Sequence, residues 1–561
     1  MKKTLALLLC AAFLVLLISG CGGKAAPAPS APAAPDGSAA AEPNAPEESY
    51  PIPQLTIGTT NLVEYAVRGE YNYDMISTAA TELPLVWQDT VGEFHPLLAD
   101  YATEDATTWT YTIREGMTWD DGVPVTAEDI LFTLQYEDSE GSANLISQTD
   151  AEGNETPAKY VSYSISEDGR SISLTLAAPN VRELSSMTYF RTMPKHVYEG
   201  KPAVTEAEAR IGCGPYRFRS FDRNSGTLTF EANPDYPEKP NVSRLVYRFF
   251  NNEDTLYLAL QNGDLDMVWA YSAGVAAAYQ DVLAASDSVQ LVSVPAVNVP
   301  SVLGFNNARG FFADENLRQA VASALDYSQF RTYFGSVYAG LPNRGFVPAA
   351  TVGYADTDAL HTDAGKAAGF MAAAGYASRN ENGFFVNADG SEAGFTLTYN
   401  ADKEVHAGCA ELLKTQLEAF GIHVTLDGTD KDSYNAKTSN KFSENNITME
   451  AALYGFTAAG MGMGSGLGSI YVDGNHAVQG GCQVFDPEFQ EILADLADSR
   501  TPEEYGEAAA LLQDYYAQHV PLLALYWDDL LLACSARYEN LTADCLFGLN
   551  NVNNWFSITA K

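Results

Sequence analysis

Hydrophobic and polar residues alternate in several short stretches of the chain, which is the pattern of strands with one buried face. Residues 109–113 and 171–176 both alternate in this way, and Leu55 to Gly58 opens another strand-like segment. Residues 384–386 and 395–399 are also strand-like, and Asp389-Gly390 between them favours a tight turn, so this region predicts a hairpin.

Helical spacing appears between these stretches. Leu413, Leu417 and Phe420 recur along one helix face, and Gly421 follows as a residue that commonly ends helices. Residues 423–426 then have the composition of the next strand. This alternation of helices and strands predicts an α/β protein with several sheets.

The start of the chain has the pattern of an export signal. Lys2-Lys3 precedes an apolar run over residues 4–18, which is too short to span a membrane. Ile18-Ser19-Gly20-Cys21 then resembles a bacterial lipobox, in which the signal peptidase cuts before the cysteine and the cysteine carries a lipid. We expect residues 1–20 to be a lipoprotein signal peptide and Cys21 to be lipidated. An ordinary secretory signal with an incidental cysteine is the alternative.

An Ala- and Pro-rich stretch follows the export signal. Residues 21–50 cannot bury a core, and their composition is typical of a semi-rigid tether. With a lipid on Cys21, this tether would hold the folded body at the cell membrane, on its extracytoplasmic face.

Charge and motifs narrow the function. The net charge of −40 offers no basic face for phosphates, so nucleic acid is not expected as a partner, and a solvated acidic surface favours a soluble monomer. The sequence has no Gly-x-Ser-x-Gly elbow, no His-Glu-x-x-His and no Walker loop, and its seven histidines are scattered. We therefore predict that the protein is not an enzyme and uses no metal and no cofactor.

Five cysteines follow Cys21, and none of them forms a Cys-x-x-Cys pair, so a zinc or thioredoxin motif is not indicated. Cys534 and Cys545 are the nearest two in sequence and are candidates for a disulfide. The alternative is that all five are small buried residues.

The segment from Trp109 to Ile130 resembles the signature of one family. It places a strand before Ile113-Arg114, then Trp119-Asp120-Asp121-Gly122 as an aromatic-x-Asp-Gly turn, then Thr126-Ala127-Glu128-Asp129 as a helix start. Asp121-Gly122 suits a tight turn, and Asp129 stands where a capping-box partner of Thr126 would stand. This pattern is similar to the large family 5 solute-binding proteins of ABC importers for peptides and nickel.

Further segments resemble the family in the same order along the chain. They are Met193-Pro194-Lys195-His196, Ile211-Gly212-Cys213-Gly214-Pro215-Tyr216, Asn233-Pro234-Asp235-Tyr236, Asn262-Gly263-Asp264-Leu265-Asp266, Phe305-Asn306 and Leu317-Arg318-Gln319-Ala320. Each match is short, and their colinear order over residues 55–530 is what identifies the family.

The resemblance implies a bilobal, periplasmic-binding-protein-like type II fold with an additional inserted domain, which is the three-domain, cluster C-like arrangement. Lobe I would be discontinuous, comprising residues 51–80, 200–300 and 525–561. The inserted domain would cover residues 81–199, and lobe II residues 301–524. The chain would cross between the lobes near residues 300 and 525, and a small ligand would bind between them.

Candidate ligand contacts follow from position within the family pattern. They are Trp269, Tyr271, Asn306, Tyr454, Phe456, Met461 and Met463. Aromatic side chains supply contact area in such clefts, although a core role is the alternative for each of them. Met461 and Met463 lie among five glycines in residues 460–468, which indicate a flexible loop that would adapt to apolar groups.

One departure from the family bears on the ligand. Peptide-binding relatives carry an Asp just after the aromatic matching Tyr454-Gly455-Phe456, where it pairs with the peptide ammonium, whereas Thr457-Ala458-Ala459-Gly460 here has no carboxylate. The expected function is capture of a small ligand, in the first place a peptide, for an ABC permease. A nickel chelate, a glycan derivative, or a role as ligand sensor or chaperone remain alternatives.

Overall fold

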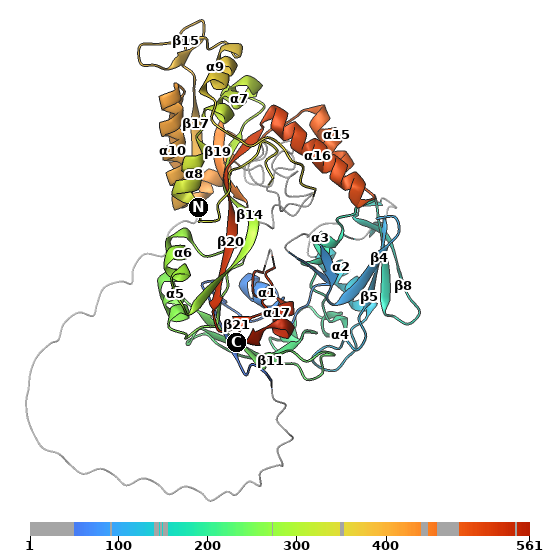
Figure 1. Ribbon diagram of the computed structural model, residues 1–561. Helices are drawn as coiled ribbons and strands as arrows, with labels where there is room; N and C mark the ends of the chain where they lie inside the picture. Colours follow the sequence, from blue (N-terminus) through green and yellow to red (C-terminus); the bar gives the residue numbers. More distant parts are fainter. Residues whose placement is uncertain are drawn as a thin grey trace, which may run out of the picture. The chain divides into compact units, whose positions relative to one another are not determined.

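A ten-stranded mixed sheet is the main element of the fold, with the strand order β10-β11-β12-β1-β13-β20-β14-β19-β17-β18 (Figure 1). The first five strands are β10 (Tyr216–Asp222), β11 (Thr227–Ala232), β12 (Arg244–Phe249), β1 (Leu55–Thr59) and β13 (Met267–Val268). The other five are β20 (Leu522–Ser535), β14 (Val289–Phe305), β19 (Ala451–Phe456), β17 (Gly394–Asn400) and β18 (His423–Thr429).

The structure is a computed structural model. It describes residues 50–89, 93–139, 145, 148–149, 155–156, 158–271, 273–347, 353–438, 447–456, 482–544 and 547–561. We keep the names lobe I, inserted domain and lobe II for the residue ranges predicted above, and those boundaries remain a prediction.

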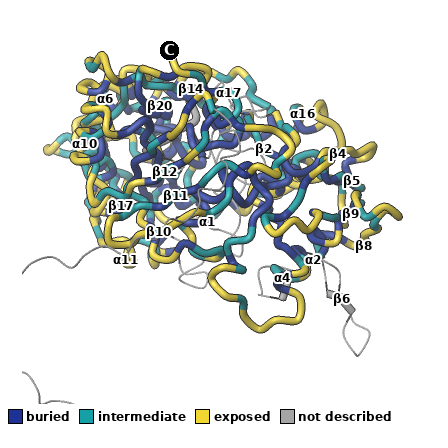
Figure 2. The backbone as a smooth tube through the Cα atoms, turned by 90° about the horizontal axis from the view of Figure 1, so that it is seen from below, coloured by how far each residue is buried: buried dark blue, intermediate teal, exposed yellow. Residues whose placement is uncertain are grey.

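Two long strands connect the two ends of the sheet. β14 and β20 pair in antiparallel fashion from Val289 opposite Ser535 to Gly304 opposite Leu522, with register shifts around Asn298 and Ser301. At one end β20 pairs with β13, and at the other end β14 pairs with β19. β20 is buried at nearly every position (Figure 2). The two strands cover the positions near residues 300 and 525 where the crossings between lobes are predicted.

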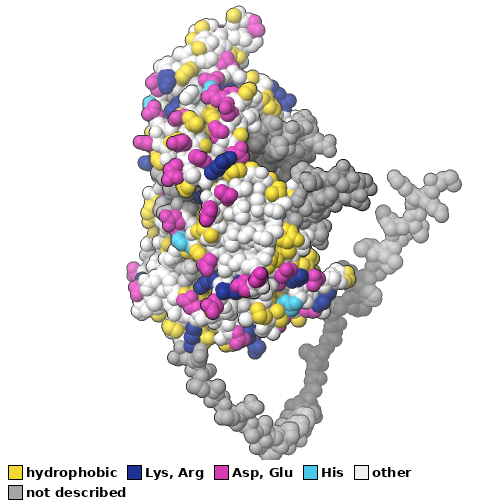
Figure 3. Space-filling view, turned by 90° about the vertical axis from the view of Figure 1, so that its right-hand side faces the viewer, with side chains coloured by type: hydrophobic (Ala, Val, Ile, Leu, Met, Phe, Trp, Pro, Cys, Tyr) yellow, Lys and Arg dark blue, Asp and Glu magenta, His cyan; other side chains and the backbone are white. Residues whose placement is uncertain are grey.

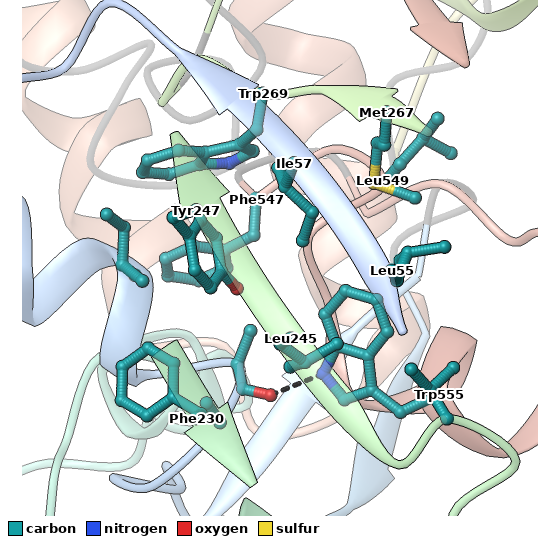
Figure 4. Close-up of a cluster of buried hydrophobic side chains, with 14 of the residues drawn as sticks. Leu55, Ile57, Phe230, Leu245, Tyr247, Met267, Trp269, Phe547, Leu549 and Trp555 are labelled. Atoms are coloured by element: carbon teal, nitrogen blue, oxygen red, sulfur yellow. Dashed lines mark hydrogen bonds between the residues drawn. The ribbon is translucent and has the colours of Figure 1, made fainter. Parts of the chain in front are cut away.

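Lobe I surrounds the first part of this sheet. Its helices are α1 (Tyr71–Ser77), α5 (Glu253–Gln261), α6 (Ala277–Ala284) and α17 (Val552–Ser557), and β21 (Tyr538–Glu539) pairs with β22 (Thr559–Ala560). Figure 4 shows its core, in which the Trp555 indole donates a hydrogen bond to the Ala79 carbonyl oxygen at 2.6 Å. Early and late residues of the chain thus share one core.

The inserted domain carries its own antiparallel sheet in the order β4-β5-β9-β8. Its strands are β4 (Ala99–Thr103), β5 (Thr108–Ile113), β9 (Ser171–Leu176) and β8 (Tyr160–Ile165), with the small pairs β2 (Val86–Gln88) and β3 (Phe94–Pro96), and β6 (Gln148–Thr149) and β7 (Glu155–Thr156). Its helices are α2 (Ala127–Ser139), α3 (Leu184–Met187) and α4 (Lys195–Tyr198), and the 3-10 turn η1 (Glu208–Arg210) follows.

Lobe II packs helices around β19, β17 and β18. They are α7 (Glu315–Ala324), α8 (Tyr327–Phe334), α9 (Ala364–Ala373), α10 (Glu404–Phe420), α11 (Lys431–Thr438), α15 (Pro487–Ala497) and α16 (Pro502–His519), with the 3-10 turn η2 (Phe311–Ala313). The hairpin predicted around Asp389-Gly390 is wrong in its pairing. The turn is present, but β17 pairs in parallel with β18 and β19, while β16 (Phe385–Val386) pairs with β15 (Ser378–Arg379).

A close approach of two backbone segments joins the inserted domain to lobe I. Gly212 and Gly214 lie against the backbone of Ala80 and Thr81, and a Cβ atom at either glycine would collide with a carbonyl oxygen there. Cys213 between them is fully buried. The Gly-x-Gly of the family pattern therefore has a physical reason, because only glycine leaves room for the neighbouring main chain.

A buried group of charged side chains lies at the same junction. Glu82 has a side-chain exposure of 1%, and its carboxylate lies 3.6 Å from Arg68 and 3.8 Å from Arg191. Arg191 also contacts Asp74 of α1 at 3.0 Å. Because Arg191 belongs to the inserted domain and the other partners lie at or near α1, these ion pairs fix the inserted domain to lobe I.

The surface and the cysteines agree with the composition. Acidic side chains are spread over the face shown in Figure 3. Cys213, Cys409, Cys482 and Cys534 are buried free thiols, and Cys545 lies outside the described residues. Among the helices that the structure describes, none is long and apolar enough to cross a membrane.

Candidate functional site

Three parallel strands of lobe I end at one edge of the sheet. β1 pairs in parallel with β12 on one side and with β13 on the other, so the residues that follow these strands lie at the same edge. In open α/β sheets, ligands bind at the carboxyl ends of the strands. Tyr71 follows β1 at the start of α1, and Tyr271 follows β13, which places both aromatic rings where a ligand is expected.

Four aromatic rings gather at this edge, and we call them the tyrosine cluster: Tyr71, Tyr189, Tyr271 and Phe547. The ring of Tyr271 lies 6.2 Å from Tyr71 and 5.8 Å from Phe547, and Tyr189 lies 6.4 Å from Phe547. Tyr71 is 60% exposed and Tyr189 41% exposed. The cluster therefore offers an accessible aromatic surface built from four distant segments.

The tyrosine hydroxyls of this cluster supply polar groups. The Tyr271 hydroxyl lies 3.4 Å from the Tyr189 hydroxyl. Partial burial and then the nearby Tyr271 raise the pKa of Tyr71, so its phenol is neutral and able to donate a hydrogen bond at neutral pH. Rings with hydroxyl groups at their tips can bind both apolar and polar parts of one ligand.

A pocket with about 400 Å³ of open space adjoins the cluster and shares Phe547 with it. Its apolar lining is Ala79, Pro84, Trp87, Leu97, Phe547 and Val552, and its polar lining is Thr78, Gln88, Thr188, Asp544, Asn550, Asn551 and Asn553. The lining thus combines apolar walls, neutral amides and one carboxylate, without Lys, Arg or His. Such a surface favours neutral or cationic groups over anionic ones.

The polar residues of the pocket are held in place by the C-terminal segment of lobe I. The Asp544 carboxylate accepts a hydrogen bond from the Phe547 backbone N–H at 2.7 Å, and Asn550 Oδ1 accepts one from the Tyr247 hydroxyl at 2.6 Å. Asn550 Nδ2 is buried and has no hydrogen-bond partner among the described residues. A buried donor of this kind is costly, and a ligand or a water molecule accepting its hydrogen would remove that cost.

One group of side chains could hold a metal ion by its geometry. The ligand atoms of Asp89, Glu93 and His95 lie within 4.8 Å of one another. His95 Nε2 is 2.9 Å from Asp89, and its ring stacks on Trp87 at 4.7 Å. The ion pair and the stacking account for this arrangement without a metal.

The predicted contacts lie in different surroundings. Tyr271 belongs to the tyrosine cluster. Trp269 is 2% exposed in the core of lobe I (Figure 4), and Tyr454 is 4% exposed in a core of lobe II. Asn306 is fully buried, and its amide bonds the Met449 carbonyl oxygen and the Ala308 N–H. Their contact with a ligand stays a prediction.

The remaining predicted contacts fall where side chains are not described. Phe456 ends β19 and its side chain is outside the description, while Met461 and Met463 lie outside the described residues altogether. The sequence reasoning missed Tyr71, Tyr189, Trp87 and Phe547. Tyr71 had a usable signal, because it is an aromatic residue that closely follows a predicted strand.

The fold and the site together define a two-lobed α/β binding protein. Residues 93–471 match the family model for bacterial extracellular solute-binding proteins, family 5, Middle. The chain belongs to the family 5 bacterial extracellular solute-binding proteins. The resemblance found in the sequence and the predicted fold class are thereby confirmed.

Named relatives share part of their length with this chain. The oligopeptide-binding protein AppA of Bacillus subtilis is 23% identical over 56% of this chain and 56% of its own length. The dipeptide-binding protein DppE of the same organism is 26% identical over 41% of this chain and 43% of its own length. The chain thus spans about half the length of the curated relatives it matches.

Solved structures share the fold over nearly their whole length. NikA from Brucella suis in complex with Fe(III)-EDTA has a TM-score of 0.74 at 16% identity, covering 91% of this chain and 100% of that one. AgaA from A. tumefacien R10 in complex with agropinic acid has a TM-score of 0.64 at 22% identity, covering 91% and 99%. CtaP from Listeria monocytogenes has a TM-score of 0.70 at 20% identity, covering 91% and 99%.

Proposed function

We propose that this protein is an extracytoplasmic lipoprotein that captures a small ligand between two lobes and delivers it to the permease of an ABC importer. The observation that carries the proposal is the tyrosine cluster with its adjoining pocket, at the carboxyl edge of the parallel strands in lobe I. The surroundings contain aromatic rings and amides, which suit reversible binding. The strands β14 and β20 support the proposed lobe boundaries, because they are long enough to reach both ends of the sheet.

A peptide is the first candidate ligand. Relatives named as oligopeptide- and dipeptide-binding proteins support it. The carboxylate that peptide binders place after the aromatic of β19 is missing from residues 457–460. Asp544 in the pocket lining is a substitute for binding the ammonium, because a carboxylate beside aromatic walls attracts a cation.

A non-peptide solute is the second candidate. The missing carboxylate favours it, and the structural neighbours in complex with Fe(III)-EDTA and with agropinic acid show that this fold accommodates such molecules. Native mass spectrometry of protein purified from its own host separates the candidates through the mass of any retained molecule. Equilibrium binding of di- to pentapeptides, compared with nickel plus free histidine, then tests each class directly.

Replacing Tyr271 with Ala should weaken ligand binding by about 1–3 kcal/mol, because it removes the central ring of the tyrosine cluster. The measurement is calorimetric titration with the peptide or solute that mass spectrometry identifies. Tyr163→Ala is the matched control, since Tyr163 is an exposed tyrosine on β8, distant in sequence from the cluster. Equal affinities for the wild type and Tyr271→Ala would remove the cluster from the binding site.

Replacing Cys21 with Ser should release the protein into the medium, because serine cannot carry the thioether-linked lipid. Fractionation of cells into membrane and medium, followed by immunoblotting, measures the distribution. Cys10→Ser provides the control, because Cys10 lies inside the apolar run of the signal and should leave anchoring intact. Membrane retention of Cys21→Ser at the wild-type level would contradict lipidation at this cysteine.

A further inference from the structure

The inserted domain contacts lobe II through one arginine held between two rings. The Arg182 guanidinium lies 4.8 Å from the ring centre of Phe94, in β3 of the same domain, and 5.8 Å from the ring centre of Tyr505 in α16. Arg182 and Tyr505 thus join parts of the chain that the predicted boundaries assign to different domains. We call Phe94, Arg182 and Tyr505 the Arg182 clasp.

Apolar packing surrounds this contact. Tyr505 is 3% exposed and belongs to a hydrophobic cluster of lobe II that also includes Phe489 and Leu512. Val181, the neighbour of Arg182, packs against the same cluster. The Nε and Nη2 atoms of Arg182 are themselves buried. A cation over an aromatic face attracts it more strongly when both are shielded from water, so this contact is stronger than an exposed one.

The two attachments of the inserted domain differ in kind. Toward lobe I, buried ion pairs of Glu82 and Asp74 and the close backbone approach at Gly214 hold it rigidly. Toward lobe II, the clasp joins side chains across a contact without a shared strand, because the inserted sheet β4-β5-β9-β8 contains no strand of lobe II. Side-chain contacts of this kind can separate while both domains stay folded.

We propose that Arg182 is a positioning residue that stabilises the closed arrangement of lobe II against the inserted domain, and so sets ligand affinity without touching the ligand. The inference rests on the proposed capture of a ligand between two lobes. A contact made only in the closed form raises the closed fraction, and apparent affinity rises in proportion to the fraction of binding-competent molecules.

The test measures lobe closure in the ligand-free protein, with fluorescent dyes on unnatural amino acids at Glu167 in the inserted domain and Glu381 in lobe II. Both positions are exposed. Arg182→Met keeps an apolar stem and removes the cation. It should lower the ratio of closed to open molecules in single-molecule energy transfer by about fivefold. Tyr505→Leu should lower the ratio in the same direction, and combining the two changes should add little.

Arg379→Met is the matched control, because Arg379 also lies over two rings, Phe385 at 3.8 Å and Phe420 at 5.7 Å, but both belong to lobe II. It should leave the ratio unchanged. Should Arg182→Met fold poorly, Arg182→Lys keeps the charge while losing planar stacking, and it should still lower the ratio. Folded Arg182 variants with the wild-type ratio would overturn the clasp. Because no ligand is added, that result is independent of whether the wild type binds a peptide, which tests the proposed function.

Discussion

Replacing Trp555 with Ala should destabilise lobe I by about 3–5 kcal/mol, which is the usual cost of removing a large buried aromatic side chain. Trp555 is fully buried, and its ring packs edge-on against Tyr216 at 6.4 Å. The substitution also leaves the Ala79 carbonyl oxygen without the indole hydrogen bond. Chemical unfolding followed by circular dichroism measures the loss.

A second substitution at Trp555 separates the two contributions. Trp555→Phe keeps most of the ring and loses only the N–H donor, so it should cost less than the alanine variant. Trp87→Ala is the control for removing an indole elsewhere, because Trp87 is only half-buried and lines the pocket. If Trp555→Ala lost no more stability than Trp87→Ala, the role of Trp555 at the centre of the lobe I core would be wrong.

Replacing Glu82 with Ala should cost about 3–5 kcal/mol, because it leaves Arg68 buried beside no full counter-charge. The Arg68 side chain is 10% exposed and that of Glu82 is 1% exposed. Both Glu82 carboxylate oxygens are buried and lack a hydrogen-bond partner among the described residues, so its ion pairs are its main compensation. Denaturant unfolding gives the change in the free energy of unfolding.

The control for this prediction is an exposed ion pair of similar geometry. Glu128 contacts Lys195 at 3.0 Å with a side-chain exposure of 49%, and Glu128→Ala should cost at most about 1 kcal/mol. The double variant Glu82→Leu with Arg68→Met removes both charges and should be more stable than either single variant. A double variant less stable than Glu82→Ala would show that the charges are not compensating one another.

Local elements could be predicted where one signal dominates. Residues 109–113 and 171–176 lie in β5 and β9, because their alternation matches a half-buried sheet. Gly421 ends α10 with a φ of 105°, which glycine adopts readily. The capping at Thr126 is also confirmed, since its N–H donates to Asp129 Oδ2 at 2.8 Å. In each case the cause lies within a few residues of the sequence.

Contacts between distant segments could not be predicted in the same way. The Asp389-Gly390 turn suggested a hairpin, but the edge of β17 was taken by β18, which arrives after the whole of α10. The tyrosine cluster escaped for the same reason, because Tyr71, Tyr189, Tyr271 and Phe547 meet only after three parts of the chain have folded. Nothing in their immediate neighbours distinguishes them from other aromatic residues.

The hydrogen bond between Trp555 and Ala79 joins residues 476 positions apart, and β1 lies in the same core as the last described segment. A chain emerging from a ribosome or a membrane pore therefore has its early strand waiting without a hydrophobic partner until its final residues arrive. Lobe II, formed largely from one continuous stretch, has no such delay. The order of assembly would thus run from the middle of the chain outward, and the lobe carrying the tyrosine cluster would be completed last.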